Sequence, residues 1–176
     1  MLTAFIREEP LRALYAHWRD RSENGRRPPG RDDMDMLNLP PTALPHAFIY
    51  EREASGRFKC RLAGTRFVDE LGYEPTGRYL DEMLDPVLGQ SRLELYEQSA
   101  TTPCALYYRA RLTPIGEEHR ESGRLLLPVG DDPRFVYGGM MVSRLAVADS
   151  AVADVDGMIE MHRDPPVGSG AVKTCG

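Results

Sequence analysis

Three ionisable side chains near the middle of the chain alternate in a way that could place them on one face of a strand. They are Glu117, His119 and Glu121. Carboxylates and an imidazole on one face could attract a metal ion, but the segment has the character of an exposed hairpin without a further strong ligand. The chain contains no glycine-rich phosphate loop, no G-x-S-x-G and no H-E-x-x-H sequence. We therefore expect no metal site, no catalytic residue and no enzyme activity.

The cysteines and the overall charge exclude further classes of protein. Cys60, Cys104 and Cys175 are odd in number and lack C-x-x-C spacing, so we expect reduced thiols instead of disulfides or a zinc site. The formal net charge is −5, from 22 basic and 27 acidic residues, which disfavours attraction to phosphate backbones. We expect no nucleic-acid partner.

No stretch of the chain is apolar over a length that could cross a bilayer. Apolar runs such as residues 125–127 and 140–142 are far shorter than the roughly 20 residues of a spanning helix. The N-terminal residues lack the basic leader and the cleavage site of a secreted protein. These features predict a cytoplasmic protein with no membrane partner.

Residues 1–24 are expected to contain an N-terminal amphipathic helix. Leu11, Leu14, Tyr15 and Trp18 fall at i, i+3, i+4 and i+7, the spacing that places them on one helix face. This face could pack on the chain's own domain, or it could form the interface of a homodimer or of a complex with a signalling protein. Both uses need the same apolar stripe, so the spacing leaves the two alternatives open.

The rest of the chain divides into a linker, a core and a tail. Residues 25–45, rich in proline and mixed charge, are expected to be a linker or wrapping loop. Residues 46–147 are the expected core, and residues 148–176 are the expected flexible tail. Within the core the patterns predict strands at 46–51 and 57–63, helices at 65–71, 77–84 and 86–101, and strands at 104–113, 119–129 and 134–144.

Alternation in the first strand after the helices predicts how the sheet is exposed. Leu106 and Tyr108 share one face of that strand, and Tyr107 and Arg109 share the other. We therefore expect a sheet with one packed face and one face in water.

Two strands, a helical segment and three strands is the chain order of a PAS domain. Residues 25–35, 61–72, 75–82 and 124–129 resemble a family of stand-alone PAS-like proteins common in alphaproteobacteria, and the resemblance covers residues 10–145. Its most specific blocks are Gly64-Thr65-Arg66 and Thr76-Gly77-Arg78. The resemblance implies an α+β fold, with a PAS-like five-stranded antiparallel sheet, helices on one face and the N-terminal amphipathic helix. It also implies a sensory or regulatory module without catalytic output.

The resemblance also bears on cofactors. Haem-binding relatives of this fold supply an iron ligand from the long helix, and no histidine lies within residues 86–101. The Asn-Cys-Arg-Phe sequence of flavin photoreceptors is absent. Haem and flavin are therefore disfavoured, and no cofactor is identified.

A small molecule bound to such a domain would lie near the helical segment. Arg66 and Arg78 are the first donors expected for a carboxylate or phosphate, although each could instead pair with a nearby acidic residue. Aromatic and apolar side chains would surround either a filled core or a cavity. With the two arginines, the expected ligand-binding residues are Phe67, Tyr79, Met83, Tyr96, Tyr108, Leu127 and Met140.

Three functions from different classes are compatible with these features. The first is a sensor whose ligand alters the association of the N-terminal helix. The second is a constitutive protein-interaction adaptor without a ligand, which would use Leu11, Leu14, Tyr15 and Trp18 as its interface. The third is a small isomerase-like enzyme, for which no buried acid–base pair can be named.

Overall fold

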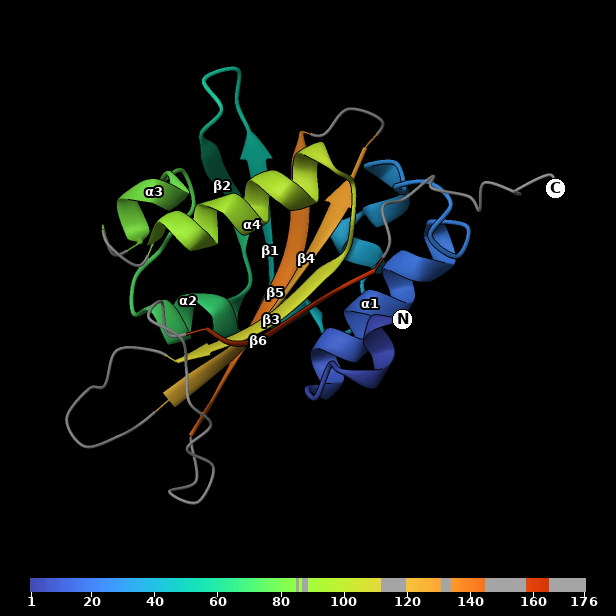
Figure 1. Ribbon diagram of the computed structural model, residues 1–176, viewed down its shortest axis with the longest axis horizontal. Coiled ribbons are helices and arrows are strands. Elements are labelled where there is room, and N and C mark those ends of the chain that lie inside the picture. Colours follow the sequence, from blue (N-terminus) through green and yellow to red (C-terminus); the bar gives the residue numbers. More distant parts are fainter. Residues whose placement is uncertain (85, 87–88, 112–119, 131–133, 145–157, 165–176) are drawn as a thin grey trace, which may run out of the picture.

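One antiparallel sheet, with helices packed on both of its faces, organises the protein (Figure 1). The computed structural model describes residues 1–84, 86, 89–111, 120–130, 134–144 and 158–164. The helices are α1 (Glu9–Arg21), α2 (Thr65–Leu71), α3 (Leu80–Met83) and α4 (Gly89–Thr101), with single 3-10 turns η1 (Leu2–Ala4), η2 (Asp32–Met34), η3 (Met36–Asn38) and η4 (Leu44–His46). The strands are β1 (Ala47–Arg52), β2 (Phe58–Ala63), β3 (Leu106–Arg111), β4 (Arg120–Val129), β5 (Phe135–Arg144) and β6 (Met158–Arg163).

The strands lie in the order β2-β1-β5-β4-β3-β6, and each neighbouring pair is antiparallel. This confirms the expected α+β fold and the expected succession of two strands, a helical segment and three strands. The sheet nevertheless has six strands where five were expected. The expectation of a flexible tail is wrong for Met158–Arg163, because these residues pair with the outer edge of β3. Segment composition does not reveal a strand that depends on backbone pairing with a distant edge.

Helix α1 covers one face of the sheet with the predicted apolar stripe. Leu11, Leu14, Tyr15 and Trp18 are each 0–1% exposed, and the indole N–H of Trp18 donates to the carbonyl oxygen of Pro128 at 2.9 Å. The stripe is therefore part of the domain's own core. The expectation that these four side chains form an interface with another chain is wrong, because the sheet already covers them.

Residues 25–45 pack on the same face as α1. Met34, Leu39 and Ala43 are at most 5% exposed and belong to the same hydrophobic cluster as the α1 stripe. The amide of Gly130 donates to the carbonyl oxygen of Pro29 at 2.9 Å. The segment thus lies against the domain, as a wrapping loop would, and does not lead away from it.

Helices α2, α3 and α4 cover the opposite face, where aromatic rings dominate the packing. The ring centre of Phe48 lies 5.0 Å from that of Phe67. The ring centre of Tyr96 lies 5.4 Å from that of Tyr50 and 5.7 Å from that of Phe58. Tilted and edge-to-face contacts of this kind stabilise the layer beyond the area that they bury.

Neither face of β3 is left in water. Tyr107 is fully buried on the α1 side, and its hydroxyl donates to the carboxylate of Glu8 at 2.9 Å. Arg109, on the same side, is 5% exposed. The expectation of one solvated face is wrong here, because elements distant in sequence cover the residues that alternation assigned to water.

Two successive glycines of β5 allow both layers to approach the sheet. A Cβ atom at Gly138 would lie 2.3 Å from the carbonyl oxygen of Leu125 and 2.5 Å from the ring of Phe48. A Cβ atom at Gly139, which faces the other layer, would lie 2.7 Å from the side chain of Leu11. Both positions therefore exclude a side chain because of packing.

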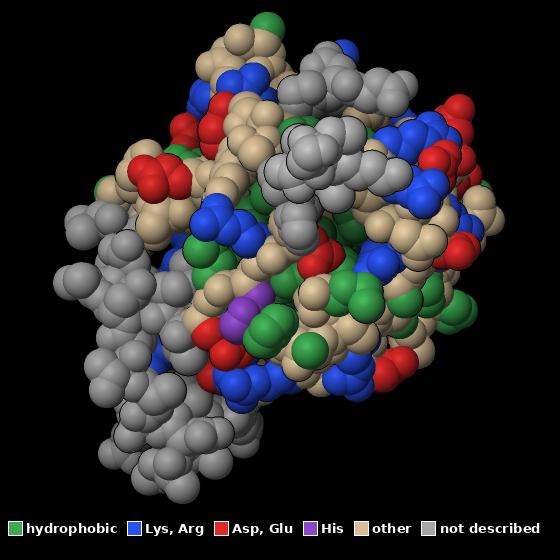
Figure 2. All heavy atoms as spheres, turned by 45° about the vertical axis from the view of Figure 1, so that its right-hand side comes forward, with side chains coloured by type: hydrophobic (Ala, Val, Ile, Leu, Met, Phe, Trp, Pro, Cys, Tyr) green, Lys and Arg blue, Asp and Glu red, His purple; other side chains and the backbone are tan. Residues whose placement is uncertain are grey.

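Two features of the described surface concern its apolar and charged character. No helix among the described residues is long and apolar enough to span a membrane. On the face shown in Figure 2, acidic and basic side chains are interspersed with small apolar areas, and no broad area carries one sign of charge. A nucleic-acid interface usually requires a basic stripe or patch.

Replacing Gly138 by alanine should destabilise the protein more than replacing Gly139. The new Cβ at position 138 meets a backbone oxygen that cannot move aside, whereas at position 139 it meets the mobile end of Leu11. From the usual cost of overpacking we expect a loss of about 3 kcal/mol for Gly138→Ala and about 1 kcal/mol for Gly139→Ala. Urea unfolding followed by circular dichroism measures both values, and equal or reversed losses would contradict this account.

Truncating Leu14 should weaken the fold itself. Leu14 is 1% exposed in the α1 cluster, and removal of a buried leucine side chain to alanine costs about 2–5 kcal/mol. Trp18 is the single tryptophan, so its fluorescence during urea unfolding reports the loss. Asp20→Ala, at an 87% exposed side chain of the same helix, is the control and should change stability by about 0.5 kcal/mol or less. If Leu14→Ala changed the free energy of unfolding only slightly but converted a dimer into monomers, the stripe would have to be an interface between chains.

Candidate functional site

Four polar side chains converge between α4 and the sheet. They are Tyr50 from β1, Tyr96 from α4, Tyr108 from β3 and Arg124 from β4, and we call them the tyrosine–arginine cluster. In the sheet Arg124 is paired with Tyr108 on one side and with Met140 on the other. Directly opposed residues of neighbouring strands share a face, so the register turns Arg124 toward α4.

The tyrosines of the cluster are buried. Tyr50, Tyr96 and Tyr108 are each 0–1% exposed, and burial raises the pKa of Tyr50 and that of Tyr96 well above the usual value. The hydroxyl groups of Tyr96 and Tyr108 approach the guanidinium of Arg124, but neither forms a well-aligned hydrogen bond with a described residue. A buried polar group that lacks a partner costs about 1–3 kcal/mol. Two such groups therefore face the same small region.

Arg124 adds a permanent positive charge to this region. Burial lowers the pKa of its guanidinium, but the neighbouring Tyr108, Tyr96 and Tyr50 outweigh burial and raise it. The group therefore stays charged at every physiological pH. In the part of the chain that the structure describes, no carboxylate forms a salt bridge with Arg124. Its charge is met by hydroxyl dipoles instead of by a counter-ion.

A second arginine approaches the cluster from the helix. Arg92 of α4 is 9% exposed, and its guanidinium carbon lies 5.6 Å from the centre of the Tyr108 ring. A guanidinium at this distance from an aromatic face is attracted by the ring. Tyr108 is thus contacted by one arginine from the sheet side and by another from the helix side.

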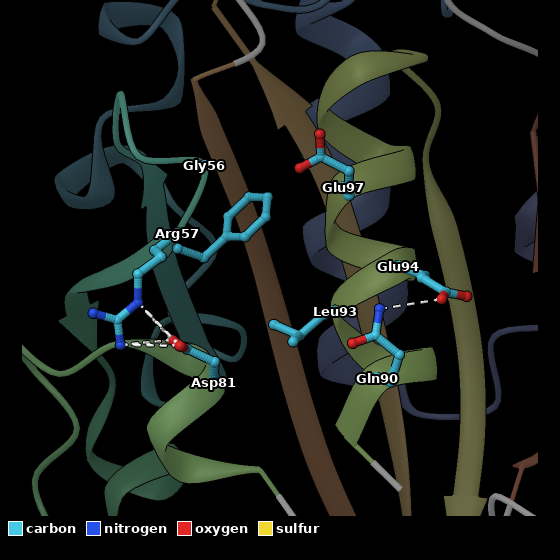
Figure 3. A pocket seen from close by; sticks show the side chains of 8 residues that line it. Gly56, Arg57, Asp81, Gln90, Leu93, Glu94 and Glu97 are labelled. Atoms are coloured by element: carbon cyan, nitrogen blue, oxygen red, sulfur yellow. Dashed lines mark hydrogen bonds and ion pairs between the residues drawn. The ribbon is translucent and has the colours of Figure 1, made fainter. Parts of the chain in front are cut away.

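A groove opens beside the cluster, between the β1–β2 hairpin, α3 and α4 (Figure 3). Its volume is about 280 Å³, and Phe58 and Leu93 supply its apolar lining. Phe58 is 3% exposed, and its ring centre lies 5.7 Å from that of Tyr96. Phe58 therefore separates the groove from the tyrosine–arginine cluster.

Charged side chains at the rim of the groove pair with one another. Figure 3 shows Arg57 directed at Asp81, to which its Nε and Nη2 atoms donate at 3.0 Å each. The Nε and Nη2 atoms of Arg52 donate to the two carboxylate oxygens of Glu97 in α4, at 2.8 and 2.7 Å. Exposed ion pairs add little stability individually. Their effect here is to tie α3 and α4 to the hairpin and so to define the width of the groove.

Several of the expected ligand-binding residues lie together in the structure. Phe67, Tyr96, Tyr108 and Met140 are buried in the cluster beneath α2, α3 and α4. Met83 packs at the margin of the same cluster. The sequence thus placed these five side chains on the correct side of the sheet.

Leu127 and Tyr79 lie elsewhere. Leu127 is packed in the α1 cluster on the opposite face, so the expectation that it lines the same space as Tyr108 is wrong. Tyr79 is near the surface, where its hydroxyl donates to Glu53 at 2.8 Å and its ring lies 3.7 Å beneath the guanidinium of Arg57. Neither side chain faces the tyrosine–arginine cluster.

The two arginines expected to bind an anion are also at the surface. Arg66 is exposed and lies 3.9 Å from the carboxylate of Asp69. Arg78 is exposed and stacks over Tyr73 at 5.1 Å. Arg66 thus makes the acidic pairing that the sequence offered as an alternative, whereas the described contact of Arg78 is with an aromatic ring.

Sequence reasoning missed Arg124, the charged member of the cluster. In β4 it has the same parity as Leu126, which is fully buried on the α4 side. Residues two apart in a strand share a face, and an arginine on a buried face is rare. That combination was the available signal, but it could be used only once the face covered by α4 was known.

The thiols and the acidic residues offer no other reactive centre in the described chain. Cys60 and Cys104 are free and buried, and burial raises the pKa of Cys60 to about 11, which keeps the thiol protonated. No group of three His, Cys, Asp or Glu side chains that could hold a metal ion occurs among the residues described. Of the three residues first considered for a metal, Glu117 and His119 lie outside the described residues, and Glu121 forms a salt bridge with Arg109.

Comparison with known proteins agrees with this geometry. No curated protein matches the chain, and no solved structure matches it. The family model described as PAS domain matches residues 6–132, a range that includes α1 to α4 and β1 to β4. Because the match spans most of the chain and the sheet has the expected antiparallel order, the chain belongs to the PAS domain family.

Proposed function

We propose that this PAS domain is a sensory module that binds a small anionic molecule between α4 and the sheet. PAS domains are in general sensory or regulatory modules without catalytic activity. One observation carries the more specific proposal: the charge of Arg124 has no carboxylate partner among the described residues, and it lies beside two buried hydroxyls that lack hydrogen bonds.

The unliganded cluster is energetically incomplete, and an anion would complete it. The guanidinium of Arg124 is partly exposed and has no carboxylate beside it among the described residues, so an anion bound there would gain a charged partner. A carboxylate could accept two parallel hydrogen bonds from the guanidinium of Arg124. Its remaining acceptor sites could receive the hydroxyls of Tyr96 and Tyr108. The hydroxyl oxygens of Tyr96 and Tyr108 can accept from the guanidinium of Arg124, but their own O–H groups still need an acceptor, which the guanidinium cannot provide.

The groove supplies a route and a size limit for the ligand. At about 280 Å³ it is at the lower end of the range for small-molecule sites, so it suits a compact metabolite. A molecule in the groove would contact Phe58 and Leu93 and would reach Tyr96 by displacing the Phe58 ring. The apolar part of the ligand would then remain in the groove while its anionic group meets Arg124.

Binding in this position would couple the ligand to the helical layer. Tyr96 belongs to α4, whereas Tyr108 and Arg124 belong to the sheet, so a ligand held by all three would bridge the two layers. A ligand shifts an equilibrium between two conformations by the difference in its affinity for them. We propose that occupancy fixes the position of α4, and that this change is read by a protein partner.

The other two functions are less well supported. The adaptor hypothesis relied on the α1 stripe, whose four side chains are covered by the sheet. For an isomerase, the cluster would need a group that exchanges protons near neutral pH, but burial raises the pKa of Tyr50 and Tyr96 and arginine stays protonated. These residues are suited to holding an anion. A cytoplasmic location is part of the proposal and is supported by the free thiols of Cys60 and Cys104.

Arg124→Gln should abolish ligand binding without weakening the ligand-free protein. Native mass spectrometry of freshly purified wild-type protein, compared with the denatured mass, should show an added small molecule that is lost in Arg124→Gln and retained in Arg66→Gln. Removal of an unbalanced charge should leave the free energy of unfolding of the ligand-free protein equal or higher.

Arg109→Gln is the matched structural control. Arg109 is a strand arginine too, but unlike the partly exposed Arg124 it is buried and forms salt bridges with Glu121 and Glu160, so its loss should cost about 3–5 kcal/mol. If Arg124→Gln were equally destabilising in ligand-free protein, Arg124 would be a structural residue and the proposed anion site would be rejected. Ligand retained by Arg124→Gln would reject it as well.

A further inference from the structure

The strand β6 is attached to the sheet by contacts with the N-terminal residues. The amide of Leu2 donates to a carboxylate oxygen of Asp164 at 3.0 Å, and the hydroxyl of Tyr15 donates to the other oxygen. The amide of Asp164 donates to the carbonyl oxygen of Ala105 at 3.0 Å. In Figure 1 the end of β6 accordingly lies close to the N-terminus and α1.

Three further contacts complete this attachment. The ring of Phe5 stacks on His162, with ring centres 3.7 Å apart and planes inclined by 10°. Glu160 lies 3.3 Å from the guanidinium of Arg7 and 3.1 Å from that of Arg109. We call the contacts of Glu160, His162 and Asp164 with these N-terminal and β3 residues the clasp.

The clasp residues of β6 share one face of the strand. Glu160 is paired with Arg109, and His162 is paired with Tyr107, so both lie on the α1 side of the sheet. Asp164 follows at the same two-residue interval. On this face β6 therefore presents an acidic side chain, then a planar one, and then a second acidic one, at every second position.

β6 is held more weakly than the strand beneath it. It pairs only with β3. Glu160, His162 and Asp164 are partly exposed, while Met161 and Arg163 are exposed. By contrast, Leu106, Tyr107 and Tyr108 of β3 are 0–1% exposed. A segment whose described side chains, those of residues 160–164, are all at least partly exposed can open locally at a lower cost than the whole domain.

Removal of β6 would uncover a sheet edge with a defined charge. The edge of β3 would present unpaired N–H and C=O groups, which accept an added strand. Arg109 would keep Glu121 as a partner, whereas the contact of Arg7 with Glu160 would be lost. The guanidinium of Arg7 and one side of that of Arg109 would thus be left without the carboxylate of Glu160, which an acidic segment could replace.

We propose that β6 is a removable strand and that the β3 edge beneath it is a docking site for an extended, acidic segment of a partner protein. β6 is additional to the five strands expected of this domain type, and it blocks the site in the structure seen here. The partner segment adds antiparallel to β3. It carries a carboxylate opposite Arg109, a planar side chain opposite Tyr107 to stack on Phe5, and a second carboxylate that reaches the amide of Leu2 and the hydroxyl of Tyr15.

The test uses the full chain and a fluorescent peptide with the sequence of residues 158–164 as the probe. Glu160→Lys in the chain places a third cation beside Arg7 and Arg109 and loosens the chain's own β6, while every residue that receives the peptide is unchanged. Arg163→Gln, at an exposed position of the same strand, is the matched control. Fluorescence anisotropy should show the peptide binding about tenfold or more tightly to Glu160→Lys than to wild type or Arg163→Gln.

Hydrogen exchange measured on the same variants reports the opening without the peptide. Amides of residues 106–111 should exchange faster in Glu160→Lys than in wild type, while those of β1 and β5 remain unchanged. Unchanged exchange at 106–111 would show that β6 is not removable and would overturn the proposal.

The identity of the occupant is tested by the peptide itself. A peptide carrying Glu160→Lys should bind the opened chain at least about tenfold more weakly, because it repels Arg7 and Arg109. Equal binding of the two peptides would overturn the acidic partner. Failure of the wild-type peptide to bind an edge that exchange shows to be open would overturn it too. Sedimentation velocity could instead show that Glu160→Lys forms concentration-dependent dimers and that these dimers do not bind the peptide. The edge would then belong to a second copy of this chain, and the proposed acidic partner would be overturned.

Discussion

Both layers of the domain depend on two successive positions of β5 that carry no side chain. β5 lies between β1 and β4, where the ring of Phe48 fills the space next to Gly138 and the side chain of Leu11 fills the space next to Gly139. Protein interiors are packed as densely as molecular crystals. A methyl group at either position would therefore displace the layer that contacts it, and the positions of α1 and of the aromatic cluster follow from this constraint.

Because both helical layers lie close against the sheet, polar side chains between a layer and the sheet are a clue to function. Apolar side chains fill most of the space beneath α4, so the guanidinium of Arg124 and the hydroxyls of Tyr96 and Tyr108 are kept away from most of the solvent. Polar groups are usually buried only when they are hydrogen-bonded. The grouping of these three polar side chains between α4 and the sheet, without a carboxylate beside Arg124 among the described residues, is what supports the proposed anion site.

The two edges of the sheet are covered by different means. At the β2 edge, Cys60 exchanges backbone hydrogen bonds with Gly77 and Arg78, at 2.8 and 2.9 Å, and this covering segment continues directly into α3 and the aromatic core. At the β3 edge, β6 is attached through backbone pairing and the polar clasp. The first cover is integral to the core, whereas the second could be lost with the rest of the fold intact. For this reason the β3 edge, and not the β2 edge, is the place where a partner strand could replace the strand that covers it.

The sequence by itself determined which segments are helices and strands in the core, and which residues share a face. The i, i+3, i+4, i+7 spacing identified Leu11, Leu14, Tyr15 and Trp18 as one buried stripe, because a helix with such a stripe must cover it. Only the tertiary structure decided what covers each face. Alternation groups Leu127 with Leu125 and Arg124 with Leu126, but the strand register and the positions of α1 and α4 decide which pair faces which layer. For the same reason Arg124 was missed, and Arg66 and Arg78 were favoured over it. The sixth strand lay beyond prediction because its stability comes from an edge and from N-terminal residues that only the folded chain brings beside it.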